Sequence, residues 1–501
     1  MPETPDTASP LPPASVADLE RDGIAWDETV DVLVVGLGAA GAATAIAAAE
    51  AGGRVLALER TGAGGGTSAM SGGLIYLGGG TATQAEAGVE DSVAAMTQFL
   101  AEALGRPADD ARLAAYCRGS IEHHDWLVAH GVPFRGVLWP EPGMEPPGTE
   151  GLVYSGGEDT APYADHIAPA ARGHVPAHPD AAGGFLMECL LAAVAASGAE
   201  VRTDTRAERL VVDGDGDDAV DSSRRVVGIT ARWQGEPVAI RATGGVVLAS
   251  GGWAYNEALV EQHVPQLNRV TWRLGTDNDD GWGLRCALGV GAATEAMGTA
   301  EVALPITPPR TMVRGILVDG NGRRFINEDT YFGHVGQRAL LEHDGVAYLM
   351  MDEPRYEVNR VGMRATWVCA TWEELTEEIG LPAGSLAATV AAYNEGAARE
   401  EDPEFGKSPE FLVPLDEPPF GAIDLRVENT IYAGFPLGGV ATTVDGAVVR
   451  PDGSTVAGLY AVGRVASSLA LERYCSGISL GEGTFFGRRA AAAAARAAGR
   501  S

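Results

Sequence analysis

The chain has 501 residues, more than a single hydrophobic core usually accommodates, so we expect two structural domains. Hydrophobic residues make up 46% of it, which is typical of a globular protein. The formal net charge of −32 at pH 7 argues against nucleic acid or an anionic membrane surface as a partner, and we interpret it as a well-solvated acidic surface.

The first residues are rich in proline, serine and acidic side chains, and they lack the basic and apolar segments of a signal peptide. We predict that residues 1–26 form a flexible tail. No apolar run is long enough to span a bilayer. The five cysteines include no C-x-x-C pair, a pattern that favours a reduced, cytoplasmic protein without a metal site.

Residues 31–59 read as a strand, a glycine turn, a helix and a second strand that ends at an acid. The run DVLVV is typical of a strand buried on both faces, and Gly36, Gly38 and Gly41 follow it as G-x-G-x-x-G. This spacing permits a tight turn, close approach of a pyrophosphate and packing of helix on strand. Glu59 is placed to accept hydrogen bonds from a ribose diol. The unit predicts a dinucleotide site, and a glycine turn in an ordinary α/β unit is the alternative.

A second glycine-rich segment, TGAGGGTSAMSGGLIYLGGG, follows this acid almost at once. It is longer than a nicotinamide dinucleotide requires, and it suggests an extended cofactor with backbone packed along it. Thr67, Ser68 and Ser71 would donate hydrogen bonds to phosphate or to ring heteroatoms.

Three later segments return to the same site. The strand at residues 239–249 runs into Gly251, a polar turn around Asp280 precedes a helix, and another strand closes on Gly463. A helix that begins near Ser479 exposes N–H groups, which suit the negative charge on the pyrimidine side of a reduced flavin. The predicted cofactor-binding residues are Gly36, Gly38, Ala39, Ala40, Gly41, Glu59, Arg60, Gly66, Thr67, Ser68, Ser71, Gly72, Gly73, Gly251, Asp280, Gly463, Ser479 and Leu480.

The chain resembles the fumarate reductase/3-ketosteroid dehydrogenase flavoproteins. Five segments carry the resemblance in the same order: VDVLVVGLGAAGAATAIAAAEAGGRVLALER, GGTSAMSGGLIYLGGG, TDNDDGWGL, RRFINED and GLYAVGR. It implies noncovalent FAD and an α/β fold, in which a Rossmann-like FAD-binding domain is interrupted by a smaller α+β catalytic domain. We place the first part of the FAD-binding domain at residues 27–272, the catalytic domain at 273–431 and the second part at 432–501.

The C-terminal segment RYCSGISLGEGTFFGRRAA is most similar to the 3-oxosteroid Δ4-(5α)-dehydrogenases, and NEDTYFG resembles the segment with their other active-site tyrosine. The resemblance implies an oxidoreductase that introduces a 4,5 double bond into a 3-ketosteroid, by loss of an α proton and transfer of a hydride to flavin N5. It also implies an external electron acceptor. On this resemblance we expect Tyr474 to take the C4 proton, Ser476 to relay it, and Tyr331 to assist or to hold the ketone. The opposite assignment of the two tyrosines stays open.

Three other functions stay open. A Δ1-dehydrogenase carries Pro-Gly-Pro-Gly after the tyrosine, where this chain has CSGI. A fumarate- or enoate-type reductase clamps a dicarboxylate with arginines and histidines; Arg310 and Arg314 lie in the corresponding region, but no histidine occurs near Pro305. A flavin-binding protein without turnover is the third alternative, against which the paired tyrosines and Ser476 argue.

Overall fold

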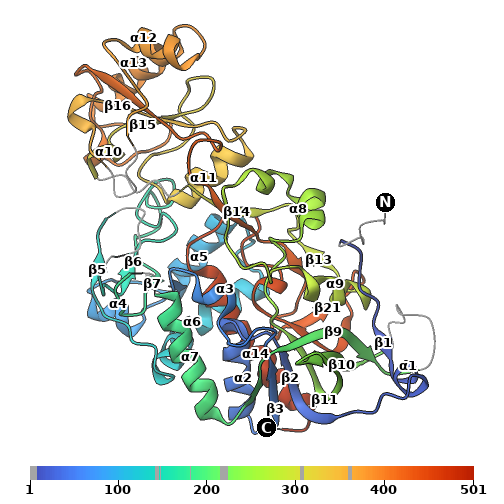
Figure 1. Cartoon of the computed structure of the whole chain (residues 1–501). Coiled ribbons are helices and arrows are strands. Elements are labelled where there is room, and N and C mark those ends of the chain that lie inside the picture. The colour runs from blue at the N-terminus through green and yellow to red at the C-terminus, as the bar shows by residue number, and fades with distance from the viewer. Residues whose placement is uncertain are drawn as a thin grey trace, which may run out of the picture.

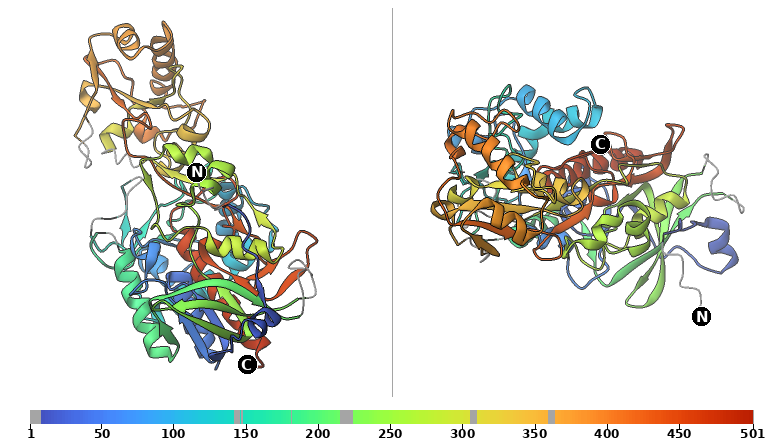
Figure 2. Two further views of the ribbon diagram at one scale, coloured as in Figure 1. Left: turned by 45° about the vertical axis from the view of Figure 1, so that its right-hand side comes forward. Right: turned by 90° about the horizontal axis from the view of Figure 1, so that it is seen from above.

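The structure is a computed structural model, and it describes residues 8–141, 146, 148–180, 182–214, 224–304, 310–358 and 364–500. It consists of a large body with a smaller lobe at one end (Figures 1 and 2). The α/β class and the FAD-binding fold that the sequence predicts are confirmed.

A nine-stranded sheet forms the centre of the large body. β2 lies between β3 and β11 and is parallel to both, while β22 is parallel to the second half of β11. β9 and β10 continue the sheet beyond β11 as antiparallel strands. The strands are β1 (Ala14–Ser15), β2 (Glu28–Val35), β3 (Val55–Leu58), β8 (Glu200–Arg202), β9 (Thr205–Val212), β10 (Val226–Trp233), β11 (Glu236–Leu248), β21 (Ala447–Val449) and β22 (Thr455–Ala461).

Helices made of small residues pack closely beside this sheet. α2 (Ala39–Glu50) connects β2 to β3, and α14 (Ile478–Ala497) packs against it although the two are far apart in sequence (Figure 1). A Cβ atom at Gly487 of α14 would lie 2.7 Å from the carbonyl oxygen of Ala40. The close approach of the two helices therefore depends on the missing side chain at this position. α7 (Gly183–Ser197) also packs against α2, and α5 (Val93–Leu104) packs against α6 (Ala111–Ala129).

The smaller lobe has a hydrophobic cluster of its own. Its sheet has the order β15-β16-β18-β17, and all of its pairs are antiparallel. The elements are β15 (Ile316–Val318), β16 (Tyr348–Asp352), β17 (Trp367–Cys369), β18 (Phe420–Asp424), α12 (Trp372–Ile379) and α13 (Ser385–Ala397). They all fall within the segment expected as the catalytic domain, whose bounds at 273 and 431 stay a prediction.

A small sheet of β12 (Trp272–Arg273), β19 (Ala433–Pro436) and β14 (Ala300–Ala303) leads toward the lobe, and α11 (Phe332–Leu341) packs on β14. The remaining elements are α3 (Gly66–Ala69), β4 (Ile75–Tyr76), α4 (Ala82–Glu86), β5 (Leu138–Trp139), β6 (Leu152–Val153), β7 (Gly173–His174), α8 (Glu257–His263), α9 (Trp282–Gly289), β13 (Thr294–Glu295), α10 (Arg310–Val313) and β20 (Gly439–Val440).

Part of the segment expected to form a loose tail has regular structure. β1 pairs in parallel with β9, and α1 (Val16–Arg21) follows it. Ser15 and Asp18 form a reciprocal capping box at the start of this helix, and Leu19 is buried. The S-x-x-D pattern in the sequence was a signal for this helix that the composition of the segment obscured.

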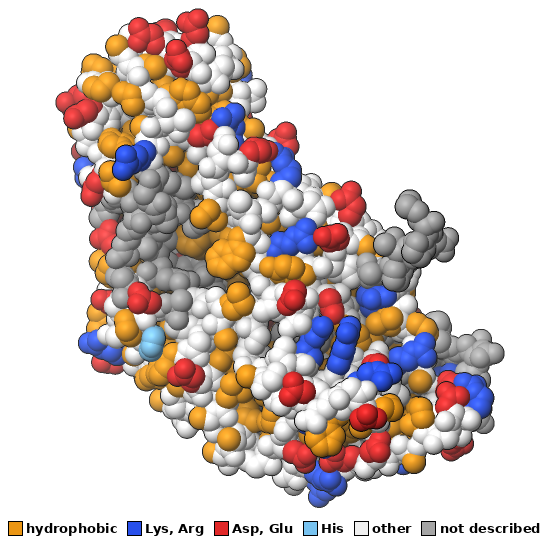
Figure 3. Space-filling model, viewed as in Figure 1, with side chains coloured by type: hydrophobic (Ala, Val, Ile, Leu, Met, Phe, Trp, Pro, Cys, Tyr) orange, Lys and Arg blue, Asp and Glu red, His pale blue; other side chains and the backbone are white. Residues whose placement is uncertain are grey.

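Acidic and basic side chains are interspersed on the face shown in Figure 3, with hydrophobic side chains between them. Of the helices in the described ranges, none has the length and apolar character that crossing a membrane requires.

Candidate active site

One cavity of about 660 Å³ lies at the carboxyl ends of the parallel strands β2, β3, β11 and β22. Open α/β sheets bind their ligands at this edge. The cavity brings together the three predicted catalytic residues and every predicted cofactor-binding residue except Gly41: Tyr331, Tyr474, Ser476, Gly36, Gly38, Ala39, Ala40, Glu59, Arg60, Gly66, Thr67, Ser68, Ser71, Gly72, Gly73, Gly251, Asp280, Gly463, Ser479 and Leu480.

Gly41 lies beneath the turn rather than in the cavity wall. A Cβ atom at Gly41 would be 2.0 Å from the carbonyl oxygen of Gly36. Gly36 itself has a φ of +102°, and a Cβ atom there would be 2.4 Å from the carbonyl oxygen of Ala249. The turn therefore requires glycine at both positions, and it leaves the backbone at Gly38 facing the cavity.

Glu59 marks one end of the cavity. Its carboxylate accepts hydrogen bonds from the backbone N–H of Leu37 at 3.2 Å and from the N–H and hydroxyl of Thr61, both at 2.9 Å. These bonds fix the buried carboxylate at the end of β3, where a ribose hydroxyl would donate to it. Arg60 and Asp280, both predicted to bind cofactor, form an ion pair of 3.0 Å at the same end.

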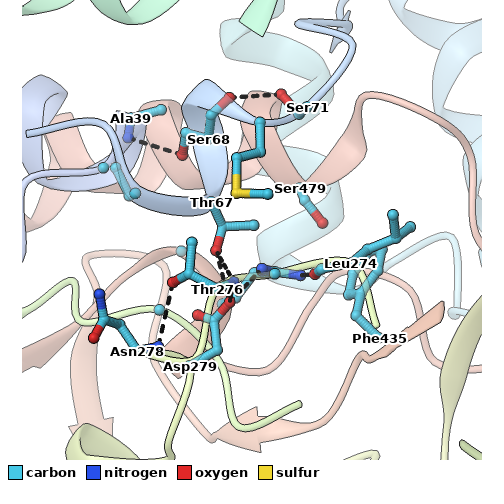
Figure 4. A pocket seen from close by; sticks show the side chains of 18 of the residues that line it. Ala39, Thr67, Ser68, Ser71, Leu274, Thr276, Asn278, Asp279, Phe435 and Ser479 are labelled. Carbon is cyan, nitrogen blue, oxygen red and sulfur yellow. Dashed lines mark hydrogen bonds and ion pairs between the residues drawn. The ribbon is translucent and has the colours of Figure 1, made fainter. Parts of the chain in front are cut away.

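Asp279 joins the two sides of the cavity. It accepts hydrogen bonds from the hydroxyl of Thr67 at 2.6 Å and from the N–H of Gly252 at 2.8 Å, and it pairs with Arg464 at 3.0 Å. Figure 4 shows Thr67 pointing across the cavity at Asp279, and Ser68 bound to the N–H of Ala39 on the opposite wall. The second glycine-rich segment and the polar turn are thus tied to each other by one buried carboxylate.

Glu301, Tyr331, Tyr474 and Ser476 line the opposite end of the cavity. Tyr331 is the residue before α11, and Tyr474 and Ser476 precede α14. The Tyr331 hydroxyl donates to Oε1 of Glu301 at 3.2 Å, while the hydroxyl oxygen of Tyr474 accepts a hydrogen bond from the N–H of Ser479 at 3.2 Å. Apolar side chains complete the wall here, including Phe435, whose ring meets that of Tyr474 edge to face.

Burial dominates the electrostatics of this end. It raises the pKa of the Tyr331 phenol well above 10, and hydrogen bonding to Ser476 acts in the opposite direction. Burial also raises the pKa of Tyr474, partly offset by its hydrogen bonds to Ser479. The carboxyl of Glu301 has its pKa raised to about 8 because burial penalises the charged form more than the bond from Tyr331 favours it. Both phenols are therefore neutral near pH 7, and each needs a partner to accept or supply a proton.

The sequence interpretation missed three residues of this site. Asp279 and Arg464 hold the cavity walls together, and Glu301 lies against a predicted catalytic tyrosine. Asp279 lies within the polar turn TDNDDG, so that turn was a usable signal. Nothing in the local sequence around Glu301 distinguishes it from a surface glutamate.

Of the two arginines considered for a dicarboxylate clamp, the structure describes the side chain of Arg314. Arg314 is not among the residues that line the cavity. The region around Pro305, residues 305–309, and the side chain of Arg310 lie outside the described residues.

The donor set of the cavity fits FAD. The fixed carboxylate of Glu59 would hold the ribose, the open glycine turn and the start of α2 would hold the diphosphate, and the start of α14 would lie against the flavin. Ser68, which bonds to the N-terminus of α2, and Thr67 lie between these points. The cavity therefore has the order of groups that an extended flavin dinucleotide requires.

Comparisons with known proteins support FAD as the cofactor. The FAD binding domain family model matches residues 31–480. The 3-oxo-5-alpha-steroid 4-dehydrogenase of Comamonas testosteroni is 26% identical over 90% of this chain and 96% of its own. The 4-oxocyclohexanecarboxylate 2-dehydrogenase of Sinomonas cyclohexanicum is 29% identical over 88% of each chain. The crystal structure of 3-ketosteroid-delta4-(5alpha)-dehydrogenase from Rhodococcus jostii RHA1 in complex with 4-androstene-3,17-dione is 42% identical, with a TM-score of 0.89, and covers 97% of this chain and 100% of that chain.

Proposed function

We propose that this chain, which belongs to the FAD binding domain family, is an FAD-dependent 3-ketosteroid dehydrogenase that introduces the 4,5 double bond. The observation that carries the proposal is the meeting of Tyr331, Tyr474 and Ser476 in one cavity with the predicted FAD-binding residues. The likeness to the Rhodococcus jostii enzyme over nearly the whole chain supports the position of the double bond.

Forming a double bond beside a ketone removes a proton from the α carbon and a hydride from the β carbon. Bound FAD supplies the two-electron oxidant that accepts the hydride. The side chains of this chain must then hold the ketone, receive the proton and keep water out. The apolar wall formed by Leu274, Ala303, Ala433 and Phe435 serves the last of these tasks.

The two tyrosines differ in their hydrogen bonds, and this difference separates their roles. The Tyr474 oxygen accepts the N–H of Ser479, and among the described residues no acceptor takes its O–H group, which can therefore donate to a ketone oxygen. Tyr331 lies between Ser476 and the carboxyl of Glu301, so it has a path along which a proton can leave. We therefore assign ketone binding to Tyr474 and proton transfer to Tyr331 with Ser476, which exchanges the roles first predicted from the sequence.

The electron acceptor and the compartment are also part of this proposal. An external acceptor must remove the two electrons after each turnover, because the reaction leaves the flavin reduced. The five cysteines are free thiols in the structure, which supports a reducing, cytoplasmic setting.

An anaerobic titration of the oxidised holoenzyme with a 5α-saturated 3-ketosteroid tests the function. We expect bleaching of the flavin absorbance and a 4-ene-3-one product. A 1-ene product would move the protein to the Δ1 class. Absence of bleaching would contradict dehydrogenation of ketosteroids and direct the test to reduced enzyme with unsaturated acids.

A further inference from the structure

Glu301 is a buried carboxylic acid in the wall of the cavity, at the end lined by Tyr331, Tyr474 and Ser476, which we call the reacting end. Only 2% of its surface is exposed, and its Oε1 accepts the hydrogen bond from Tyr331. Its Oε2 is buried and has no hydrogen-bond partner among the described residues. A carboxyl oxygen in this state is costly to keep in a folded protein, and such groups concentrate at functional sites.

The backbone around Glu301 holds the side chain in place. β14 pairs with β19 so that Glu301 stands opposite Phe435, and α11 packs on β14. Gly333, in the first turn of α11, leaves room for the pair: a Cβ atom there would be 2.6 Å from Oε1 of Glu301 and 2.2 Å from Cε1 of Tyr331. Contact between the carboxyl and the phenol is therefore part of the packing of this helix on this strand.

The groups that face Glu301 leave it without a fixed positive charge. They are the phenols of Tyr331 and Tyr474 and the buried thiol of Cys475. His334 packs against the ring of Tyr331, with 5.4 Å between ring centroids, and burial lowers its pKa to about 4, so it is neutral. Within the described part of the chain, no ion pair compensates the charge of Glu301. Its carboxyl is therefore able to gain and lose a proton near neutral pH.

We propose that Glu301 is the internal proton acceptor behind Tyr331. The proposal rests on the dehydrogenase function above, and it makes Glu301 a positioning residue that acts through Tyr331. The α C–H bond of the substrate breaks, and its proton binds the phenol oxygen of Tyr331, directly or through Ser476. The phenol proton of Tyr331 moves at the same time to Oε1 of Glu301. The electron pair of the C–H bond forms the double bond as a hydride leaves the β carbon, which FAD would accept as the two-electron oxidant, so one proton and one hydride leave the substrate.

This arrangement removes the main difficulty of a tyrosine base. A buried phenolate is unfavourable here because burial raises the pKa of Tyr331 well above 10. A phenol that passes on its own proton as it receives another never carries the charge. An acceptor with a pKa of about 8 is close to the working pH, where general base catalysis is efficient.

The test compares Glu301→Gln with Glu342→Gln, which makes the same chemical change at an exposed, paired glutamate at the end of α11. Anaerobic flavin bleaching by a 5α-saturated 3-ketosteroid is measured from pH 6 to pH 9. We expect the wild-type rate to rise through a single ionisation near pH 8. Glu301→Gln should bleach about 10²- to 10⁴-fold more slowly and lack this ionisation, whereas Glu342→Gln should match the wild type.

Infrared difference spectra of the substrate-free holoenzyme over the same pH range give a readout that does not depend on activity. A protonated-carboxyl band should disappear near pH 8 in the wild type and in Glu342→Gln, and be absent from Glu301→Gln. Bleaching of Glu301→Gln at the wild-type rate with the wild-type pH profile would overturn the role of Glu301 alone. No bleaching of the wild type would overturn the dehydrogenase function and this role with it. If the variant does not fold, the wild-type rate profile and spectra still test the proposal, because absence of a carboxyl ionisation near pH 8 in either would contradict it.

Discussion

Replacement of Gly333 by alanine sets two effects against each other: local helix preference favours alanine, whereas the geometry of the site leaves no room for its Cβ atom. In an isolated helix the change favours folding by roughly 1 kcal/mol, because alanine is the better helix former. In this protein the added Cβ atom would lie 2.2 Å from Cε1 of Tyr331 and 2.6 Å from Oε1 of Glu301. Ordinary contacts between such atoms are about 3.5–4 Å, so the pair must move by about 1 Å.

A shift of this size should disrupt the hydrogen bond between Tyr331 and Glu301. Misplacing a reacting group by about 1 Å costs about 10²-fold in rate, so we expect flavin bleaching by substrate to slow by that factor while FAD stays bound. Gly184→Ala is the matched control, because Gly184 lies in α7 and a Cβ atom there meets only the carbonyl oxygen of Ala69 at 3.7 Å. A Gly333→Ala protein that bleaches at the wild-type rate would refute the reasoning.

Two further predictions follow from the same end of the cavity. Tyr474→Phe should retain FAD, as measured by its visible absorbance, but slow substrate-driven bleaching by about 10²-fold or more; near-normal bleaching would exclude a role in holding the ketone. The pKa of Glu301 rises from 4.5 to about 8 on folding, so its contribution to stability is complete below pH 4.5 and is lost as the pH rises through 8. Between pH 5 and pH 9, the stability of Glu301→Gln should therefore fall less than that of the wild type, and the two decreases should differ by at most about 5 kcal/mol. Thermal unfolding of both proteins over this pH range measures the difference; parallel curves would contradict the raised pKa.

The glycine turn and the position of Glu59 in the cavity wall were predictable because their residues are close in sequence. A strand, three glycines, a helix and an acid within thirty residues dictate the turn at Gly36, the packing at Gly41 and the place of Glu59. The two tyrosines proposed to be catalytic were reached only through resemblance, because an isolated tyrosine in a sequence gives no sign of a role.

The sequence by itself thus determined the fold class, the cofactor and the family of reactions. Tertiary structure alone decided which side chains meet at the reacting end. Glu301 and Tyr331 are thirty residues apart, and they touch because α11 packs on β14 over a glycine. Asp279 gains its role because three distant segments converge on its carboxylate. Periodicity and propensity describe neighbours along the chain, whereas proton transfer and cavity shape depend on neighbours in space.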